Sequence, residues 1–383
     1  MPAALDALAK IEREPWRARQ IVEQFATSHA FPLMEGDTAT FFFWDDRPTQ
    51  AVYLQHWVFG LSSRVEFQRF PGTDAFYLFL DLPREARVEY KLGVVREGRD
   101  SWIQDPRNHR RAYDPFGSNS VCPAGSYVEP EWTLHDPQSR QGALRQGSLS
   151  SRVFGEERRY QVYLPAEARP GKLYPLLVVH DGNDYLHFAA FRTVLDNLIH
   201  RHEVAPLIAC FTSGGARNQE YAANPTHADF LHDELLPHLE AHYPVLPGAK
   251  HRGLLGASFG AVASLYAATR HPGTWGRLCL QSGSFAFTDI GDHQRGALWD
   301  PIVKFMNGFR DTPPDLGARV FQSCGTFESL IYYNRSLVPL FQRVTEDHRF
   351  VEAPDGHNWI NWRDRLRDGL AYLFPGPLWM YYE

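Results

Sequence analysis

The sequence has few cysteines, and their positions exclude the commonest cysteine-based sites. The 383 residues include four cysteines, with no C-x-x-C pair and no spacing typical of metal ligands. Three of them, Cys210, Cys279 and Cys324, lie in apolar runs typical of buried strands. We therefore expect reduced thiols in a core rather than disulfides or a metal site.

Long apolar runs and blocks of like charge are also missing. No stretch approaches the roughly 20 apolar residues that span a bilayer, and the charged N-terminus has no apolar core typical of a signal peptide. The formal net charge is −6, from 39 basic and 45 acidic residues without a concentrated block of either sign. This favours a cytoplasmic protein with a small-molecule partner, and it disfavours a nucleic acid or a membrane as partner.

The N-terminal part is predicted to hold helices and then a β-sandwich. Apolar residues at helical spacing predict two short helices within residues 4–28, so residues 1–30 form a helical lead. Short runs rich in aromatic and β-branched residues follow, separated by turn signals and without helical periodicity. They predict a β-sandwich over residues 31–130 that ends in a closing loop, 105–130, and a polar linker over residues 131–150.

From residue 151 to residue 383 the pattern changes to alternating strands and helices. The run YPLLVVHDG is almost fully apolar, as expected for a strand covered on both faces. Segments with helical periodicity separate it from further apolar strands such as LIACFTSG and RGLLGASFG. This order predicts an open α/β domain with a mostly parallel sheet and helices on both faces.

The sharpest chemical signal is Gly256-Ala257-Ser258-Phe259-Gly260. An apolar strand runs into this G-x-S-x-G motif and a helix of small residues follows it, which is the strand–turn–helix setting of a nucleophilic serine. The glycines allow a sharp turn and close passage of neighbouring backbone. We predict that Ser258 is the nucleophile. The alternative is a glycine-rich helix start in which Ser258 is an ordinary N-cap.

A serine nucleophile needs a base, and the chain order serine, acid, histidine selects the candidates. His357, the last histidine, follows a strand on a loop and is the predicted base. Glu328 follows the preceding strand and is the predicted acid, which would hold the imidazole tautomer. Asp355 competes for that role but lies too close to His357 in sequence. Otherwise, His357 is a turn residue and Glu328 a solvated loop carboxylate.

The oxyanion hole is expected to use two backbone N–H groups. The first belongs to Phe259, which follows the nucleophile. The second comes from the loop after the early apolar strand, residues 180–183, where we select Asn183 and where Gly182 permits the turn. The alternative for this loop is a plain Asp-Gly turn.

Several segments together resemble known families. VYLP, LLVVHDG, VLDNLI, ARNQEY, ELLPHLEAHYPV, LLGASFGAVASL, LQSGSF and DGHNWINW resemble the putative-esterase (esterase D-like) family over residues 151–375. FPLMEGDTATFFFW, FPGTDAFYLFLDLP, VEYKLG and DPRN resemble the N-terminal domain of enterochelin (enterobactin) esterases. The resemblance implies an α/β-hydrolase fold preceded by an Ig-like sandwich of the early-set type.

The resemblance also implies a function and further site residues. It implies a cytoplasmic serine esterase that cleaves the ester bonds of a catecholate siderophore and needs no cofactor. It points to Arg217 as a substrate-pocket residue, with Glu220 fixing the local structure, and to Trp359 as a pocket wall. The alternative for Arg217 is a surface ion pair with Glu220.

Two other functions stay open. One is a feruloyl, acetyl or other short-acyl esterase whose sandwich binds carbohydrate. The other is an inactive hydrolase fold kept as a binding protein. The intact serine, glutamate and histidine order argues against loss of activity. The oligomeric state is not predicted.

Overall fold

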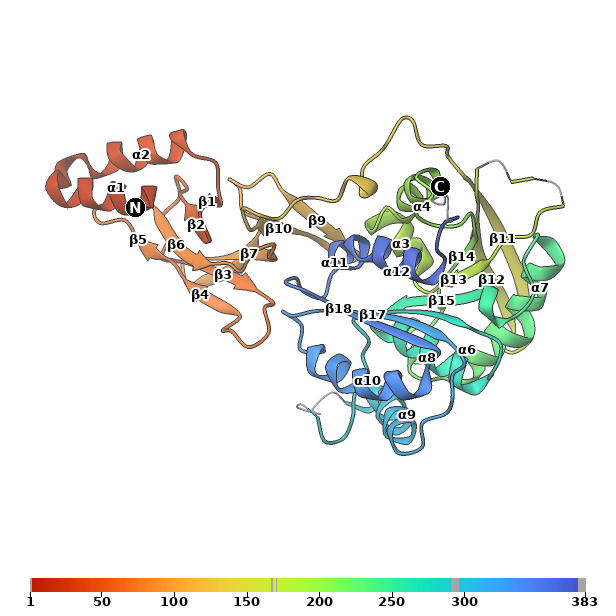
Figure 1. Ribbon diagram of the computed structural model, residues 1–383. Coiled ribbons are helices and arrows are strands. Elements are labelled where there is room, and N and C mark those ends of the chain that lie inside the picture. The colour runs from red at the N-terminus through yellow and green to blue at the C-terminus, as the bar shows by residue number, and fades with distance from the viewer. Residues whose placement is uncertain (1, 167, 170, 291–295, 378–383) are drawn as a thin grey trace. The chain divides into compact units, whose positions relative to one another are not determined.

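The computed structural model describes residues 2–166, 168–169, 171–290 and 296–377 and is shown in Figure 1. Contacts divide the chain into two compact units. Unit 1 holds Met1–Val128 and two segments from late in the chain, Thr326–Ser329 and Ala353–Asn358. Unit 2 holds Glu129–Gly325, Leu330–Glu352 and Trp359–Glu383. Glu328 and His357, the predicted acid and base, therefore belong to unit 1.

Unit 1 begins with helices that pack on a sheet. The helices are α1 (Ala3–Arg13), the short 3₁₀ turn η1 (Pro15–Arg17) and α2 (Ala18–Ser28), so the two helices predicted within residues 4–28 are confirmed. Ile11 and Phe25 lie on their buried faces and share a core cluster with Phe42 and Tyr77 of the sheet. Each helix thus buries one apolar stripe and leaves its polar face to solvent.

Two antiparallel sheets of unit 1 share a second core. The first has the order β1 (Leu33–Glu35), β2 (Thr38–Phe43), β6 (Phe76–Asp81), β5 (Gln68–Arg69). The second has the order β4 (Arg64–Glu66), β3 (Ala51–His56), β7 (Arg87–Arg96), β10 (Gly117–Pro123), β9 (Arg111–Asp114), with β8 (Arg99–Ile103) paired to β7. Phe41 and Phe43 of β2 pack with Val88 and Leu92 of β7. Alternation along β2 sends Phe42 to the other face, toward the helices.

Unit 2 is built on a mixed eight-stranded sheet. Its order is β11 (Ala143–Ser151), β12 (Glu156–Leu164), β14 (Ile208–Thr212), β13 (Leu176–Val179), β15 (Arg252–Ala257), β16 (Arg277–Gln281), β17 (Arg319–Gly325), β18 (Asp347–Ala353). The β11–β12 and β12–β14 pairs are antiparallel, and the strands from β14 to β17 are parallel. The predicted α/β-hydrolase fold is confirmed for this part of the chain.

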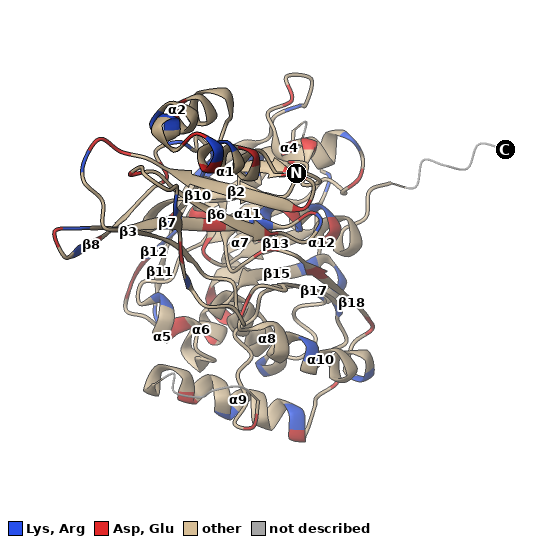
Figure 2. Cartoon of the chain, turned by 90° about the vertical axis from the view of Figure 1, so that its left-hand side faces the viewer, with Lys and Arg blue, Asp and Glu red and all other residues tan. Residues whose placement is uncertain are grey.

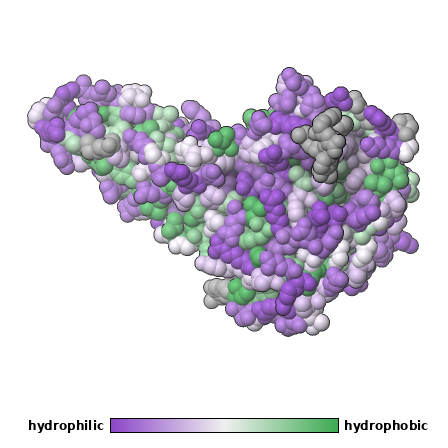
Figure 3. Space-filling view, viewed as in Figure 1, coloured by the Kyte–Doolittle hydropathy of each residue, from purple (hydrophilic) through white to green (hydrophobic). Residues whose placement is uncertain are grey.

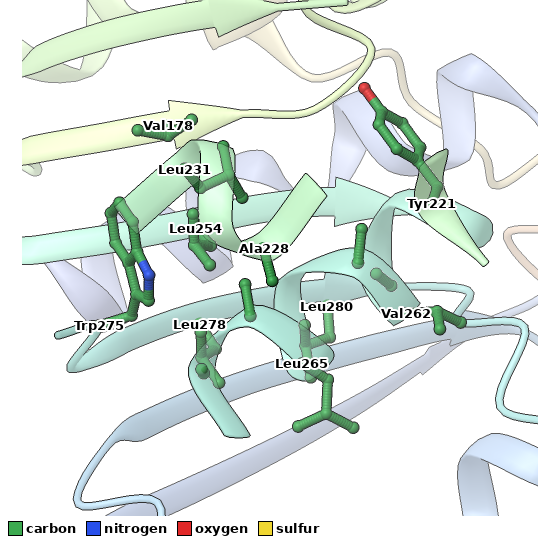
Figure 4. Close-up of a cluster of buried hydrophobic side chains, with 14 of the residues drawn as sticks. Val178, Tyr221, Ala228, Leu231, Leu254, Val262, Leu265, Trp275, Leu278 and Leu280 are labelled. Carbon is green, nitrogen blue, oxygen red and sulfur yellow. The ribbon is translucent and has the colours of Figure 1, made fainter. Parts of the chain in front are cut away.

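Helices cover both faces of this sheet. They are α3 (Gly182–Phe188), α4 (Phe191–His200), α5 (Arg217–Tyr221), α6 (Pro225–Asp229), the π-helical η3 (Phe230–Leu235), α7 (Leu236–His242), α8 (Phe259–Arg270), α9 (Asp300–Asp311), α10 (Ile331–Val344), α11 (Trp359–Asp364) and α12 (Leu366–Leu373). Short 3₁₀ turns are η2 (Glu131–Thr133), η4 (Ala249–His251) and η5 (Ala297–Trp299). Val178 and Leu254 face the cluster under α6, α8, α9 and α10. Figure 4 draws part of this cluster, including Val178, Leu254 and Leu265. Leu177 and Leu255 face the opposite cluster, with α3, α4, α11 and α12.

Two predicted loops are wrong in part. The closing loop 105–130 contains the paired strands β9 and β10, and the linker 131–150 contains most of β11. The polar composition of both segments concealed them. Asn119 of β10 is satisfied by donating to Glu89, and β11 lies at the sheet edge with most side chains in solvent. A strand whose polar groups find partners or water needs no apolar alternation.

Charged side chains of both signs are mixed over the elements in view. In Figure 2, Lys and Arg side chains (blue) are interspersed with Asp and Glu (red). The face shown in Figure 3 is largely polar, with scattered apolar side chains. Within the described ranges, every helix is too short or too polar to cross a bilayer. All four cysteines are buried and free, which confirms the predicted core thiols.

Candidate active site

Ser258 lies on a sharp turn between β15 and α8. Its backbone has φ +57° and ψ −119°, a conformation that costs a non-glycine residue about 1–3 kcal/mol and persists only where the surroundings enforce it. Its N–H donates to the carbonyl of Gln281 at 2.9 Å, and its carbonyl accepts from the N–H of Ser284 at 3.2 Å. The neighbouring strand and its following loop therefore hold the turn on both sides.

The flanking glycines of the motif have a steric reason. A Cβ on Gly256 would lie 2.3 Å from the backbone carbonyl of Gly260, and a Cβ on Gly260 would lie 3.2 Å from Cβ of His180. The chain thus folds back on itself across the serine and also passes close to the end of β13. The first contact leaves no room for a side chain at Gly256, and the second would require the His180 side chain to shift if Gly260 were replaced.

Replacing Gly256 by alanine is expected to lower the free energy of unfolding by about 1–3 kcal/mol, because the added methyl group meets backbone rather than a movable side chain. Urea denaturation measures the change through the transition midpoint at constant slope. Gly308→Ala is the matched control. A Cβ there meets nothing within 4 Å in a helix, so the variant is expected to be as stable as the natural chain or more stable. Equal stability of both variants would contradict the steric account.

The hydroxyl of Ser258 has a second serine beside it. Ser284 Oγ lies 3.1 Å from Ser258 Oγ and is buried on the loop that follows β16. Ser284 was not predicted as a site residue, although it lies in LQSGSF, one of the segments that resemble the esterase family. The two hydroxyls lie within hydrogen-bond distance of each other.

Glu328 and His357 form a short, asymmetric pair in unit 1. Nδ1 of His357 lies 2.6 Å from Oε2 of Glu328. The glutamate side chain is 1% exposed and the histidine side chain 39% exposed. A buried carboxylate at this distance selects the tautomer protonated on Nδ1 and stabilises the imidazolium, so Nε2 becomes the basic nitrogen. The pair has the geometry of a base held by its acid.

Asp355, the competing acid, has a different partner. Its carboxylate accepts from Arg87 at 3.2 Å to each oxygen and from the N–H of Gly356 at 2.7 Å.

The predicted triad is divided between the two units. Ser258 lies in unit 2 and the Glu328–His357 pair lies in unit 1, so the nucleophile turn and the acid–base pair are each described within their own unit.

The residues chosen for the oxyanion hole lie at two helix starts. Phe259 is the first residue of α8. The predicted loop 180–183 is shorter than expected, because α3 begins at Gly182 directly after Asp181, whose φ is +52°. Asn183 therefore lies in the first turn of a helix. Backbone N–H groups in a first turn have no acceptor within their own helix. Glycine is required at 182, where a Cβ would lie 2.4 Å from Phe211.

Arg217 has a partner other than the one considered from the sequence. Its Nε and Nη2 each lie 2.6 Å from a carboxylate oxygen of Asp181, while Glu220 pairs with Arg158. The alternative Arg217–Glu220 surface pair is therefore wrong. The two hydrogen bonds between the Arg217 guanidinium and the Asp181 carboxylate fix the turn after β13. Because the Arg217 side chain is 37% exposed, its positive charge also reaches the protein surface.

Trp359 is more buried than a pocket wall needs to be. It is 9% exposed and packs edge-on against Tyr185 of α3 and Trp362 of α11, with ring centroids 5.1 and 4.8 Å apart. These contacts join α3 to α11 in the core, and its role as a wall stays a prediction.

Two buried histidines behind the elbow were not anticipated. His180 and His227 face each other with Nε2 atoms 3.0 Å apart. Burial lowers the pKa of His180 to about 4 and holds the pKa of His227 well below its usual value, so both rings are neutral near pH 7. No group of three or more histidine, cysteine, aspartate or glutamate residues suited to a metal ion occurs within the described ranges.

Comparison with known proteins places this site in a family context. The model of the family described as "Putative esterase" matches residues 151–373. An iron(III) enterobactin esterase of Escherichia coli is 26% identical over 251 residues, which are 64% of this chain and 60% of that protein. The chain thus spans less than two thirds of that relative's length. An iron(III) enterobactin esterase of Dickeya dadantii is 25% identical over 361 residues, 81% of this chain and 79% of that protein.

A solved structure supports the fold over most of the chain. The ferric enterobactin esterase of Salmonella typhimurium superposes with a TM-score of 0.75 at 20% identity, and the match covers 89% of this chain and 95% of that one. At this identity the likeness concerns the fold alone.

Proposed function

Because the chain belongs to the family described as "Putative esterase", we propose that it is a serine carboxylic-ester hydrolase that works through an acyl-enzyme. The observation that carries this proposal is the strained turn at Ser258, which follows closely on Gly256, a position that admits no side chain. A protein that only binds esters has no need to hold a serine in such a conformation. Glu328 and His357 supply the acid–base pair that the chemistry requires.

In the proposed mechanism, Ser258 Oγ attacks the ester carbonyl carbon while His357 Nε2 accepts the hydroxyl proton. The tetrahedral oxyanion accepts hydrogen bonds from the N–H groups of Phe259 and Asn183. The ester C–O bond then breaks as His357 returns the proton to the leaving alcohol. Water, activated by the same imidazole, hydrolyses the acyl-enzyme and frees Ser258. Glu328 orients the ring and stabilises its charged form throughout.

The proposed substrate is a catecholate siderophore of the enterobactin type. Two relatives, one matched over 64% of this chain and the other over 81%, are named iron(III) enterobactin esterases. Arg217 offers a partly exposed guanidinium that suits an anionic catecholate, and we assign it to substrate binding with Trp359 as a wall of the pocket. We also assign the paired sheets of unit 1 to an Ig-like sandwich of the early-set type. The cytoplasmic location stays a prediction.

A substrate panel tests this function. We expect a cyclic catecholate trilactone to be cleaved with a kcat/KM at least about 10-fold above those of methyl ferulate and p-nitrophenyl butyrate, since matched polar contacts reject analogues that leave them unpaired. Chromatography of the acid products measures all three reactions on one scale. A preference for the feruloyl or short-acyl ester would support the second esterase function. No hydrolysis of any ester would support the binding protein.

A further inference from the structure

The loop that carries His357 is fastened to the first residue of a sandwich strand. Arg87 begins β7, and its Nη1 donates to both carboxylate oxygens of Asp355 at 3.2 Å and to Oδ1 of Asn358 at 3.1 Å. Its backbone N–H donates to the carbonyl of Pro354 at 3.1 Å. One residue of unit 1 thus binds the loop on both sides of His357.

Arg87 is itself held in place. Its side chain is 3% exposed, and Nη2 donates to Oε1 of Glu89 at 2.7 Å. Glu89 accepts in turn from Nδ2 of Asn119, on the adjacent strand β10, at 2.9 Å. Burial raises the pKa of the carboxyl groups of Asp355 and Glu89, and the Arg87 guanidinium opposes both rises. Arg87 is thus a buried cation between two carboxylates. Its removal would leave both carboxylates without their charged partner, which is strongly unfavourable, so the side chain is firmly held.

The same network closes the loop around the imidazole. Asp355 Oδ1 also accepts from the N–H of Gly356 and from Nδ2 of Asn358, both at 2.7 Å. These two contacts hold Gly356 and Asn358, the residues immediately before and after His357. The ring therefore leaves the loop in one direction, toward Glu328.

The loop of Glu328 is tied to the same framework. The N–H of Phe327 donates to the carbonyl of Asp355 at 3.1 Å, and the carbonyl of Phe327 accepts from the N–H of Phe59 at 2.8 Å. Phe59 lies between β3 and β4 of the sandwich. Both loops of the acid–base pair are thus connected to each other and to the N-terminal strands.

We propose that Arg87 is a positioning residue for ester hydrolysis: through Asp355 and Asn358 it sets the direction of the His357 ring, which makes the sandwich part of the catalytic machinery. The proposal rests on the proposed function. It differs from an accessory role of the sandwich, in which substrate binding alone would depend on it.

The kinetic test replaces Arg87 by methionine and by lysine. We expect Arg87→Met to lower kcat about 10- to 100-fold with KM changed less than about two-fold, since orienting partners of catalytic groups have effects of that size. Arg87→Lys keeps the charge but loses the fork, so its kcat should lie between the two. Arg96→Met is the matched control, because Arg96 ends β7 and pairs with Asp45 far from the loop. It should keep kcat within about two-fold.

A second readout does not depend on turnover. The hydrogen-bonded Nδ1–H of His357 should give a low-field proton resonance at low temperature, identified by its loss in His357→Ala. We expect the resonance in the natural chain and in Arg96→Met, and its broadening or loss in Arg87→Met. Inertness toward every ester would refute the proposed function, and this resonance would still decide the role of Arg87.

Folding of the variants is checked by circular dichroism. Should Arg87→Met fail to fold, Asn358→Ala takes its place, because it removes the side-chain contacts of Asn358 with Arg87 and Asp355 and leaves the buried Arg87–Asp355 ion pair intact. The same direction of change in kcat and resonance is expected. A folded Arg87→Met or Asn358→Ala with natural kcat and an unchanged resonance would overturn the proposal, as would a rise in KM at constant kcat.

Discussion

Replacing Ser258 by alanine is expected to lower kcat for p-nitrophenyl butyrate by roughly 10⁴- to 10⁶-fold, because the variant lacks the oxygen that forms the acyl-enzyme. The remaining rate would come from binding and from amides that stabilise the oxyanion. The substitution removes one oxygen and keeps the backbone contacts of the turn to Gln281 and Ser284. Stopped assays over hours, with purified variant free of natural enzyme, give the residual rate.

Ser336→Ala is a suitable control for that experiment. Ser336 lies on α10, and its hydroxyl donates to the carbonyl of Tyr333 one turn earlier. Its removal should leave kcat within about two-fold of the natural value. If Ser258→Ala retained a tenth or more of the natural kcat while Ser336→Ala behaved as expected, Ser258 would not be the nucleophile.

The second large effect is expected at His357. His357→Ala should lower kcat by a similar factor, roughly 10⁴- to 10⁶-fold, because the serine then has no base. Glu328→Gln keeps the size of the side chain but loses the charge that stabilises the imidazolium, so a loss of roughly 10⁴-fold is expected. Both measurements use the same ester as the Ser258 experiment.

Combination with Ser258→Ala shows whether the residues act together. Because the serine and its base serve one step, the double variant Ser258→Ala/His357→Ala should be no slower than the slower single variant. Multiplied losses would mean that His357 acts in a separate step, and an active His357→Ala would mean that another group is the base.

Much of the geometry of the candidate site could be predicted because its signals are local. Gly256 and Gly260 lie within the motif of Ser258, and the close contact between their backbones arises from that turn alone. Glu328 and His357 are 29 residues apart, yet each follows a strand of the sheet, and strand order predicted their meeting. Such inferences need only the chain order and the knowledge that parallel strands end at one edge.

The contacts that hold these residues could not be predicted in the same way. Arg87 and Asp355 are 268 residues apart, and no pattern around either one marks the other. Asp181 and Arg217 are 36 apart, and the sequence suggested Glu220 as the partner because helical neighbours are easier to recognise. Ion pairs between distant segments depend on packing that single-sequence patterns do not encode.

Labelling with a fluorophosphonate tests the central claim most directly, since the reagent reacts with a serine only when its hydroxyl is activated. Intact-protein mass spectrometry and peptide mapping locate the adduct. The account predicts one adduct, on the peptide that contains Ser258, with none on Ser258→Ala and much slower labelling of His357→Ala. An adduct on another residue, or no adduct on a protein that still hydrolyses esters, would contradict it.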